Sequence, residues 1–182
     1  MLRTRRLSCV ALPLLLATAA AVRTAQAQLP EAAPVAAPAP LFASHDLLEL
    51  TLIADFDALE DDRAEEDNPE RPALLRVHDP AGNAVELPLD VRTRGFFRLR
   101  RSTCAFPNLR LDFPSSSAAL PTVFAGQDRL KLVAHCRDDD EYEQNLLEEY
   151  LAYRLYNLLT EESFRVRLAR ITYQDVNRKK DT

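Results

Sequence analysis

The stretch over residues 128–173, DRLKLVAHCRDDDEYEQNLLEEYLAYRLYNLLTEESFRVRLARITY, contains the patterns that decide the fold. Apolar and polar residues alternate over residues 129–136, which predicts a strand with Leu130 and Leu132 on its core face. Residues 163–173 alternate in the same way and predict a second strand. Between them, apolar residues recur at the period of a helix, which we expect to begin within residues 138–141 and to end near Leu159.

The predicted helix has an unusually broad apolar face. Its central stripe consists of leucines at helical spacing, namely Leu147, Leu151, Leu155 and Leu158. A helix with this pattern is expected to pack against a sheet. The acidic residues at its start complement the helix dipole, which accounts for them without a metal ion. Glu143, Arg154 and Asn157 lie between apolar positions and are expected to form polar pairs, either structural or functional, of which the structural pair is the simpler interpretation.

Further strands are expected upstream of this stretch. Residues 47–55 and 104–113 each alternate, and residues 74–78 and 84–94 form a predicted hairpin around the turn sequence DPAGN. The acidic residues 57–70 lack the glycine and the ligand spacing of a calcium loop and are expected to form a solvated loop. The sequence therefore predicts an α+β fold, with a mostly antiparallel sheet of five or six strands and one long helix packed on it.

The amino terminus has the three parts of an export signal. A basic start, an apolar run and the small residues around Ala25 and Ala27 predict a cleaved signal peptide over residues 1–27, with an uncleaved anchor as the alternative. Residues 28–40 predict a disordered Ala/Pro linker. One domain is expected over residues 41–176, followed by a polar tail, 177–182, which suggests a truncated chain or a frayed end. We therefore expect an exported protein, periplasmic or extracellular, without a stable membrane span after cleavage.

The charge of the chain argues against nucleic acid as a partner. Removing residues 1–27, which hold four arginines and no acid, changes the formal net charge from −5 to −9. A polyanion would be repelled by such a domain as a whole, although a local basic face could still bind phosphate or an acidic glycan.

Two cysteines remain after the predicted cleavage, Cys104 and Cys136. In an exported protein they are expected to form a disulfide with each other. His135 beside Cys136 raises the alternative of a zinc site, but two cysteines and one adjacent histidine do not have the spacing of known zinc modules. We therefore predict no metal site.

The run VRTRGFFRLRR, residues 91–101, carries five arginines around Gly95. Arginine forks suit phosphate and carboxylate groups, so one interpretation is an anion-binding strand that includes Arg92 and Arg94. The other interpretation is an outer face paired with the protein's own carboxylates, which is the commoner role of charged runs.

Sequence motifs of common enzymes are absent. The chain has three glycines, too few for a Walker or dinucleotide-binding loop, and no GxSxG, HExxH or CxxC motif. The residues therefore display no active site, and we expect no cofactor in this chain.

Four segments in a fixed order resemble the amino-terminal part of the bacterial spore-coat protein H kinase-like family. These segments are RTRGFFRLR, CAFPNLRLDF, FAGQDRLKLVAHC and YEQNLLEEYLAYRLYNLLTEESFRVRLARITY. The resemblance covers about residues 85–175, and its helix-to-strand part is the most specific. That family resembles atypical protein kinases, with ATP and a divalent metal ion held between two lobes.

The resemblance implies roles for a few residues. Lys131 would lie in the nucleotide-facing strand, and Glu148 would be its partner on the helix, as in the lysine–glutamate pair of kinases. Arg92 and Arg94 match the R-x-R-G positions of the family. Its metal-binding and catalytic acids lie beyond the last strand of this chain and have no counterpart here. ATP and magnesium are therefore expected only for a full kinase-like protein.

Two functions of different classes follow from these patterns. The first is the amino-terminal lobe of a spore-coat H-type atypical kinase, catalytically incomplete in this chain. The second is a stand-alone cell-envelope binding module that holds an acidic or phosphorylated ligand, or a protein partner, through the arginine-rich strand. A structural segment without an activity of its own is a third possibility.

Overall fold

The computed structural model describes residues 40–63 and 68–177. Six strands of this part form one sheet in the order β5-β4-β3-β2-β1-β6. The strands are β1 (Leu48–Ala54), β2 (Arg71–His78), β3 (Ala84–Arg94), β4 (Asn108–Asp112), β5 (Arg129–Leu132) and β6 (Ala169–Asp175). The predicted signal peptide, most of the predicted linker and residues 178–182 of the predicted tail lie outside the described residues. No helix in the described part is long and apolar enough to cross a membrane.

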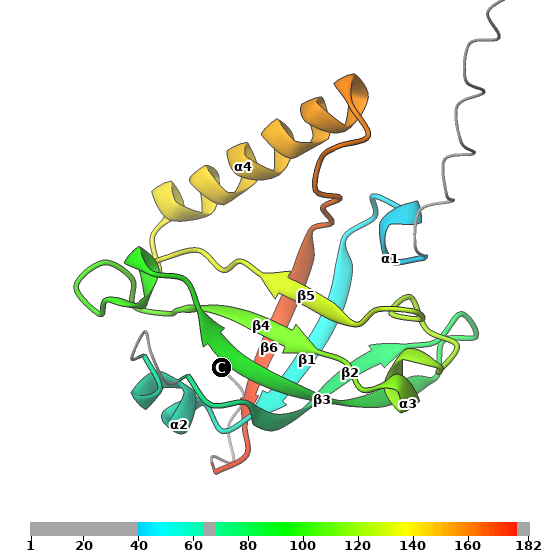
Figure 1. Cartoon of the computed structure of the whole chain (residues 1–182), viewed down its shortest axis with the longest axis horizontal. Coiled ribbons are helices and arrows are strands. Elements are labelled where there is room, and N and C mark those ends of the chain that lie inside the picture. Colours follow the sequence, from blue (N-terminus) through cyan, green and yellow to red (C-terminus); the bar gives the residue numbers. More distant parts are fainter. Residues whose placement is uncertain (1–39, 64–67, 178–182) are drawn as a thin grey trace, which may run out of the picture. The chain divides into compact units, whose positions relative to one another are not determined.

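The sheet is mixed, which corrects the expectation of a mostly antiparallel sheet. Strands β1 to β5 pair antiparallel with their neighbours, but β6 pairs parallel with β1 along its whole length, from Leu48 opposite Ala169 to Ala54 opposite Asp175. A parallel pair requires a long crossover. The chain between β1 and β6 includes the long helix, which directly follows β5. Strand β6 then pairs with β1 at the opposite edge of the sheet from β5 (Figure 1).

The predicted hairpin is present and joins β2 to β3. The carboxylate of Asp79 accepts hydrogen bonds from the backbone N–H groups of Ala81 and Asn83, at 2.9 and 2.8 Å. Gly82 has a φ of 86°, which a residue without a side chain adopts most readily. The turn therefore fixes the register in which Val77 lies opposite Val85 and Leu75 opposite Leu87.

The core lies on one face of the curled sheet, where apolar residues alternate with charged ones along each strand. Its strand residues are Leu50, Leu52, Ala54, Ala73, Leu75, Val77, Leu87, Leu89, Val91, Leu109 and Leu111. Leu41 of α1 (Pro40–Ala43), Leu59 of α2 (Phe56–Asp61) and Phe124 complete it. Phe113 stacks on Phe124 at 5.5 Å between ring centroids, beside α3 (Ser115–Ala118). Short elements therefore fill the space that we expected the long helix to fill.

Helix α2 corrects the expectation that residues 57–70 form a loop throughout. Asp55 caps the helix, because its carboxylate accepts a hydrogen bond from the backbone N–H of Ala58 at 2.9 Å. Leu59 is buried in the core, and Asp62 pairs with Arg71 at the start of β2. The sequence did not predict this short helix, because half of its residues are acidic and only Leu59 is fully buried, so no apolar periodicity is visible.

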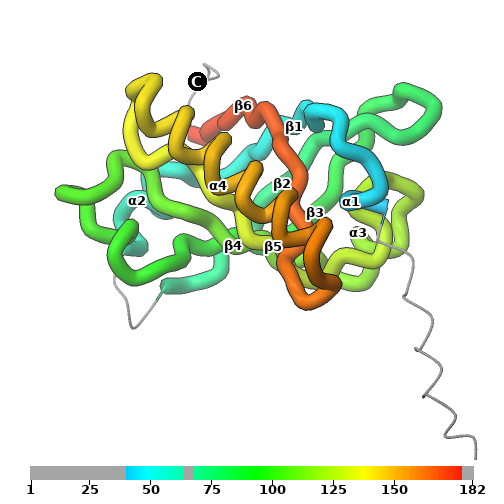
Figure 2. Tube along the Cα trace, turned by 90° about the horizontal axis from the view of Figure 1, so that it is seen from above, coloured from blue at the N-terminus to red at the C-terminus, as the bar shows by residue number. Residues whose placement is uncertain are grey.

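The long helix is present as α4 (Asp140–Leu159), capped by the side chain of Asp139. Its predicted packing on the sheet is wrong, however, because none of its residues is buried. Figures 1 and 2 show α4 on the side of β5, above the sheet. Three leucines of the predicted stripe point away from the domain: Leu151, Leu155 and Leu158 are 57%, 63% and 79% exposed, whereas Leu147 is half-buried. The half-buried side of α4 carries Leu146, Tyr150 and Tyr153 instead.

Candidate functional site

A row of three cations crosses the outer face of the sheet. On β3, Arg92 and Arg94 alternate with buried Val91 and Thr93, so both arginines lie on the face away from the core. The strand register places Arg92 opposite Arg110 of β4, and Arg110 opposite Lys131 of β5. Side chains directly opposite one another have Cβ atoms about 5 Å apart. We call Arg92, Arg110 and Lys131 the basic row.

The middle member of the basic row is neutralised by acids. Arg110 pairs with Asp112 at 2.6 Å and with Glu70 at 2.5 Å. Asp112 also accepts a hydrogen bond from Arg129, at 2.8 Å. Partial burial alone would raise the pKa of Asp112, but the hydrogen bonds from Arg129 and Arg110 outweigh it and hold that pKa below its usual value. Asp112 is therefore ionised at neutral pH and holds both arginines.

The outer members of the row, and Arg94 beside them, have no such partners in the described part of the chain. Neither Arg92 nor Arg94 forms an ion pair or a side-chain hydrogen bond within residues 40–63 and 68–177, where such bonds are found for most other arginines. The Nζ atom of Lys131 lies 4.5 Å from the ring centroid of Phe164, in the segment before β6. A cation over a ring keeps its charge available to an anion on its other side.

The remaining arginines of residues 91–101 do not join this face. Arg98, in the short 3-10 helix η1 (Phe97–Leu99), lies 3.8 Å from Glu149 of α4. Arg100 lies over the rings of Phe96 and Phe97, and Arg101 pairs with Glu60 and Asp61 of α2. The expectation of self-paired arginines therefore holds for Arg98 and Arg101, while Arg92 and Arg94 fit the anion-binding interpretation.

The kinase-like pair expected from the resemblance is not formed. Glu148 is exposed on the outward side of α4, where it accepts a long hydrogen bond of 3.5 Å from Gln144, and Lys131 faces Phe164. The neighbouring residue, Glu149, is the carboxylate that turns toward the domain. One residue is 100° of helix rotation, so a carboxylate one position away from the expected one changes face.

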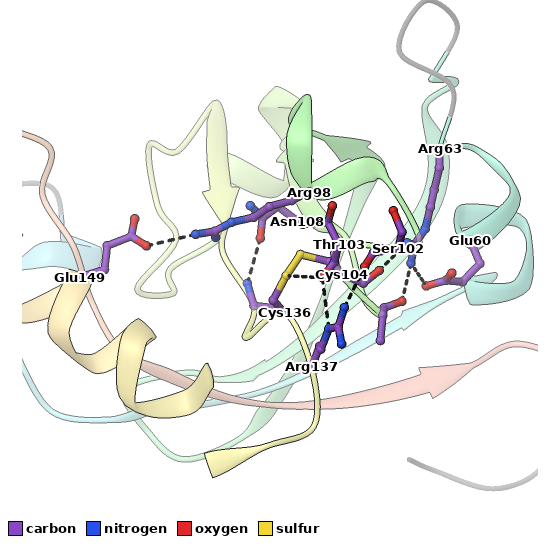
Figure 3. The surroundings of a disulfide bond; sticks show 12 residues. Glu60, Arg63, Arg98, Ser102, Thr103, Cys104, Asn108, Cys136, Arg137 and Glu149 are labelled. Carbon is purple, nitrogen blue, oxygen red and sulfur yellow. Dashed lines mark hydrogen bonds and ion pairs between the residues drawn. A yellow bond between two sulfur atoms is a disulfide. The ribbon is translucent and has the colours of Figure 1, made fainter. Parts of the chain in front are cut away.

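Cys104 and Cys136 form the predicted disulfide, with a Cα–Cα distance of 4.6 Å. Figure 3 shows how it ties the segment before α4 to the loop before β4. Arg137 donates hydrogen bonds to the carbonyl oxygens of Ser102 and Thr103, and the N–H of Ala105 donates to the carbonyl oxygen of Cys136 at 2.8 Å. The disulfide and these bonds fix the point at which the chain enters α4.

A hollow of about 450 Å³ lies between η1, the segment after β5 and α4. Its lining includes Phe97, Arg98, His135, Tyr142 and Glu149. This volume is within the range of small-molecule sites. The lining nevertheless contains both partners of the Arg98–Glu149 pair, so these two charges balance each other, whereas Arg92, Arg94 and Lys131 have no carboxylate partner within the described residues. Within the described residues, no group of three or more His, Cys, Asp or Glu side chains is placed to hold a metal ion.

Sequence reasoning identified Arg92, Arg94 and Lys131 but missed Arg110 and Phe164. Arg110 was visible as an outward residue of its strand, and only the register of β3 and β4 brings it beside Arg92. The sequence predicts a strand over residues 163–173, but β6 begins at Ala169 and leaves Phe164 in the connecting segment.

Comparison of the chain with protein-family models, curated proteins and solved structures finds no match.

Proposed function

We propose that this domain binds an acidic or phosphorylated ligand on the outer face of β3, β4 and β5, through Arg92, Arg94 and Lys131. The observation that supports the proposal most is that these three cations have no carboxylate partner in the described part of an otherwise acidic chain. The Cys104–Cys136 disulfide suits an oxidising compartment. An exported protein that acts in the periplasm or outside the cell is therefore part of this proposal.

The cations of the basic row repel one another, and acids neutralise one of the three. Like charges directly opposite each other on neighbouring strands destabilise a sheet, by roughly 0.2 to 1 kcal/mol for each pair. The row contains two such contacts, Arg92 with Arg110 and Arg110 with Lys131. Asp112 and Glu70 neutralise Arg110 and so weaken both contacts, but they leave Arg92 and Lys131 without a carboxylate partner. A bound phosphate or carboxylate would relieve the outer two, and the arginine fork matches the geometry of either group.

The test is binding of inorganic polyphosphate, measured by calorimetry at low and at physiological salt. The variant R92Q/R94Q/K131Q is expected to bind on the order of 100-fold more weakly, because each exposed charge contact contributes roughly 1 kcal/mol. A matched control, R76Q/R165Q/R170Q, removes three cations that are already paired with Glu86, Glu161 and Glu49. The control is expected to bind as the original chain does. An equal loss in both variants would show that net charge alone governs binding, and would reject the site.

The second candidate is the amino-terminal lobe of a kinase-like protein of the spore-coat H type. It is supported by the order of elements, because β5 with Lys131 is followed by α4 and then by β6, as the resemblance implies. It requires Lys131 to exchange the ring of Phe164 for an ATP phosphate. The residue of α4 that would have to pair with Lys131 is Glu149 or, after a rotation of the helix, Glu148.

This candidate predicts binding of an ATP analogue that depends on magnesium and on Lys131. In a fluorescence titration, chelation of magnesium or the variant K131M should abolish binding, whereas R92Q/R94Q should change it less than threefold. The reverse pattern, with binding that resists chelation and needs Arg92 and Arg94, would favour the acidic-ligand module and count against the lobe. We expect no phosphoryl transfer by this chain in either case.

A further inference from the structure

Helix α4 has two unlike faces, and the inner one is held by polar contacts. Asn157 donates a hydrogen bond to the carbonyl oxygen of Phe164 at 3.0 Å, and Arg154 meets the His45 ring nitrogen at 2.7 Å. Tyr153 lies edge-on to Phe164, with 6.1 Å between ring centroids. These contacts fix the rotation of α4 about its axis, and therefore determine which residues point outward.

The outward face of α4 is apolar in its second half. We call Leu151, Leu155 and Leu158 the leucine stripe; these residues lie within about 60° of one another around the helix axis. They are 57%, 63% and 79% exposed, and Leu159 beside them is 82% exposed. Single exposed leucines are ordinary, but a contiguous apolar patch with a polar border marks an interaction surface.

The first half of the same face is acidic and polar. Asp140, Gln144 and Glu148 continue the line of the leucine stripe toward the helix N-terminus, and all three are exposed. The carboxylate of Asp140, in the first turn of α4, lies near the positive end of the helix dipole, which stabilises it there. The surface is therefore polarised along its length, acidic at the start and apolar at the end.

A second copy of this chain does not fit that polarity. In an antiparallel pair of α4 helices, each leucine stripe would face the acidic half of the other helix. In a parallel pair, Asp140 and Glu148 would face their own copies. A pair shifted to overlap only the apolar halves would share about 12 Å of helix, at 1.5 Å for each residue. Such an overlap falls short of the roughly 1,000 Å² that a specific interface buries.

We propose that the outward face of α4 docks a helical segment of another protein that is apolar in its first half and rich in lysine or arginine in its second half. Bound antiparallel, that segment lays its apolar half on the leucine stripe and its basic half on Asp140 and Glu148. Basic residues at the C-terminal end of a helix also complement that helix's own dipole. Charge and apolarity therefore agree on one orientation, independently of the function proposed above.

The test uses two fluorescently labelled synthetic helical peptides of 18 residues. Both have leucine and alanine in the first half; one has lysine at four positions of the second half, and the other has glutamate at those positions. In an anisotropy titration the lysine peptide is expected to bind, and the glutamate peptide at least tenfold more weakly. The variant L151Q/L155Q/L158Q should bind the lysine peptide on the order of 100-fold more weakly.

The control variant F96Q/V176Q changes two exposed apolar residues outside α4 and should bind the lysine peptide normally. Should the triple leucine variant not fold, the single variant L158Q, at the most exposed position of the stripe, is expected to weaken binding about fivefold. Equal binding of the two peptides, or an equal loss in the control, would overturn the proposal. So would sedimentation that shows the free chain as a dimer which the leucine variant dissociates, because a second copy would then be the occupant.

Discussion

Removal of the Cys104–Cys136 disulfide is expected to lower the free energy of unfolding by about 3 to 4 kcal/mol. The bridge spans 32 residues, and in the chain-entropy account a loop of that length lies between the roughly 3 kcal/mol of a 15-residue loop and the roughly 4.7 kcal/mol of a 100-residue loop. Cys104 is buried beside the sheet, and the variant C104A/C136A removes the bridge without adding a polar group. Urea denaturation of this variant and of the original chain measures the difference.

The loss is also expected to be uneven across the domain. Helix α4 has no buried residue, and the disulfide and Arg137 fix its start. Without the bridge, α4 should lose hydrogen-exchange protection before β2 and β3, which pair along the whole of β2. Alkylation of the chain without prior reduction is the control, since it leaves the bridge intact. An unchanged urea midpoint, with α4 protected as before, would show that the bridge is not structural.

The strands were predictable because each has one face in the core. Every second residue of 84–94 is apolar over most of its length, as a half-buried strand requires, and the structure buries Leu87, Leu89 and Val91. The turn residues around Gly82 predicted the hairpin for a local reason. The turn needs a residue with a positive φ, and glycine adopts that conformation at no steric cost. The disulfide followed from the number of cysteines and from the predicted compartment. The strand and the turn were therefore predictable from a few neighbouring residues, and the disulfide from the number of cysteines.

The parts that failed depend on contacts between distant residues. The period of α4 predicts a stripe but does not tell whether a sheet or solvent lies beside it, and α1, α2 and Phe124 already occupy the core. The parallel pairing of β6 with β1 joins residues about 120 positions apart. The basic row likewise depends on the register of three strands, which brings Arg110 between Arg92 and Lys131. Each of the three residues lies on a different strand, so the sequence of any one strand contains only one member of the row.

The clearest consequence of this arrangement is a contrast between two leucines. Leu52 of β1 is completely buried, between Leu75 of β2 and Tyr173 of β6 in the sheet register, whereas Leu155 of α4 is 63% exposed. The variant L52A is expected to lose about 3 to 5 kcal/mol of the free energy of unfolding, because it removes buried methyl groups and leaves a cavity. The variant L155A makes the same chemical change on the leucine stripe and is expected to change that free energy by less than about 0.5 kcal/mol.

Urea denaturation of the two variants against the original chain provides the comparison, and the slope of the transition should stay the same in all three. The two substitutions are matched, so their difference reports burial and not the identity of the side chain. A loss for L155A as large as that for L52A would mean that something covers the leucine stripe in the free chain. In that case α4 would be part of the core, and its outward face would be closed to any partner. A small loss for L155A beside a large one for L52A leaves that face open, as the docking proposal requires.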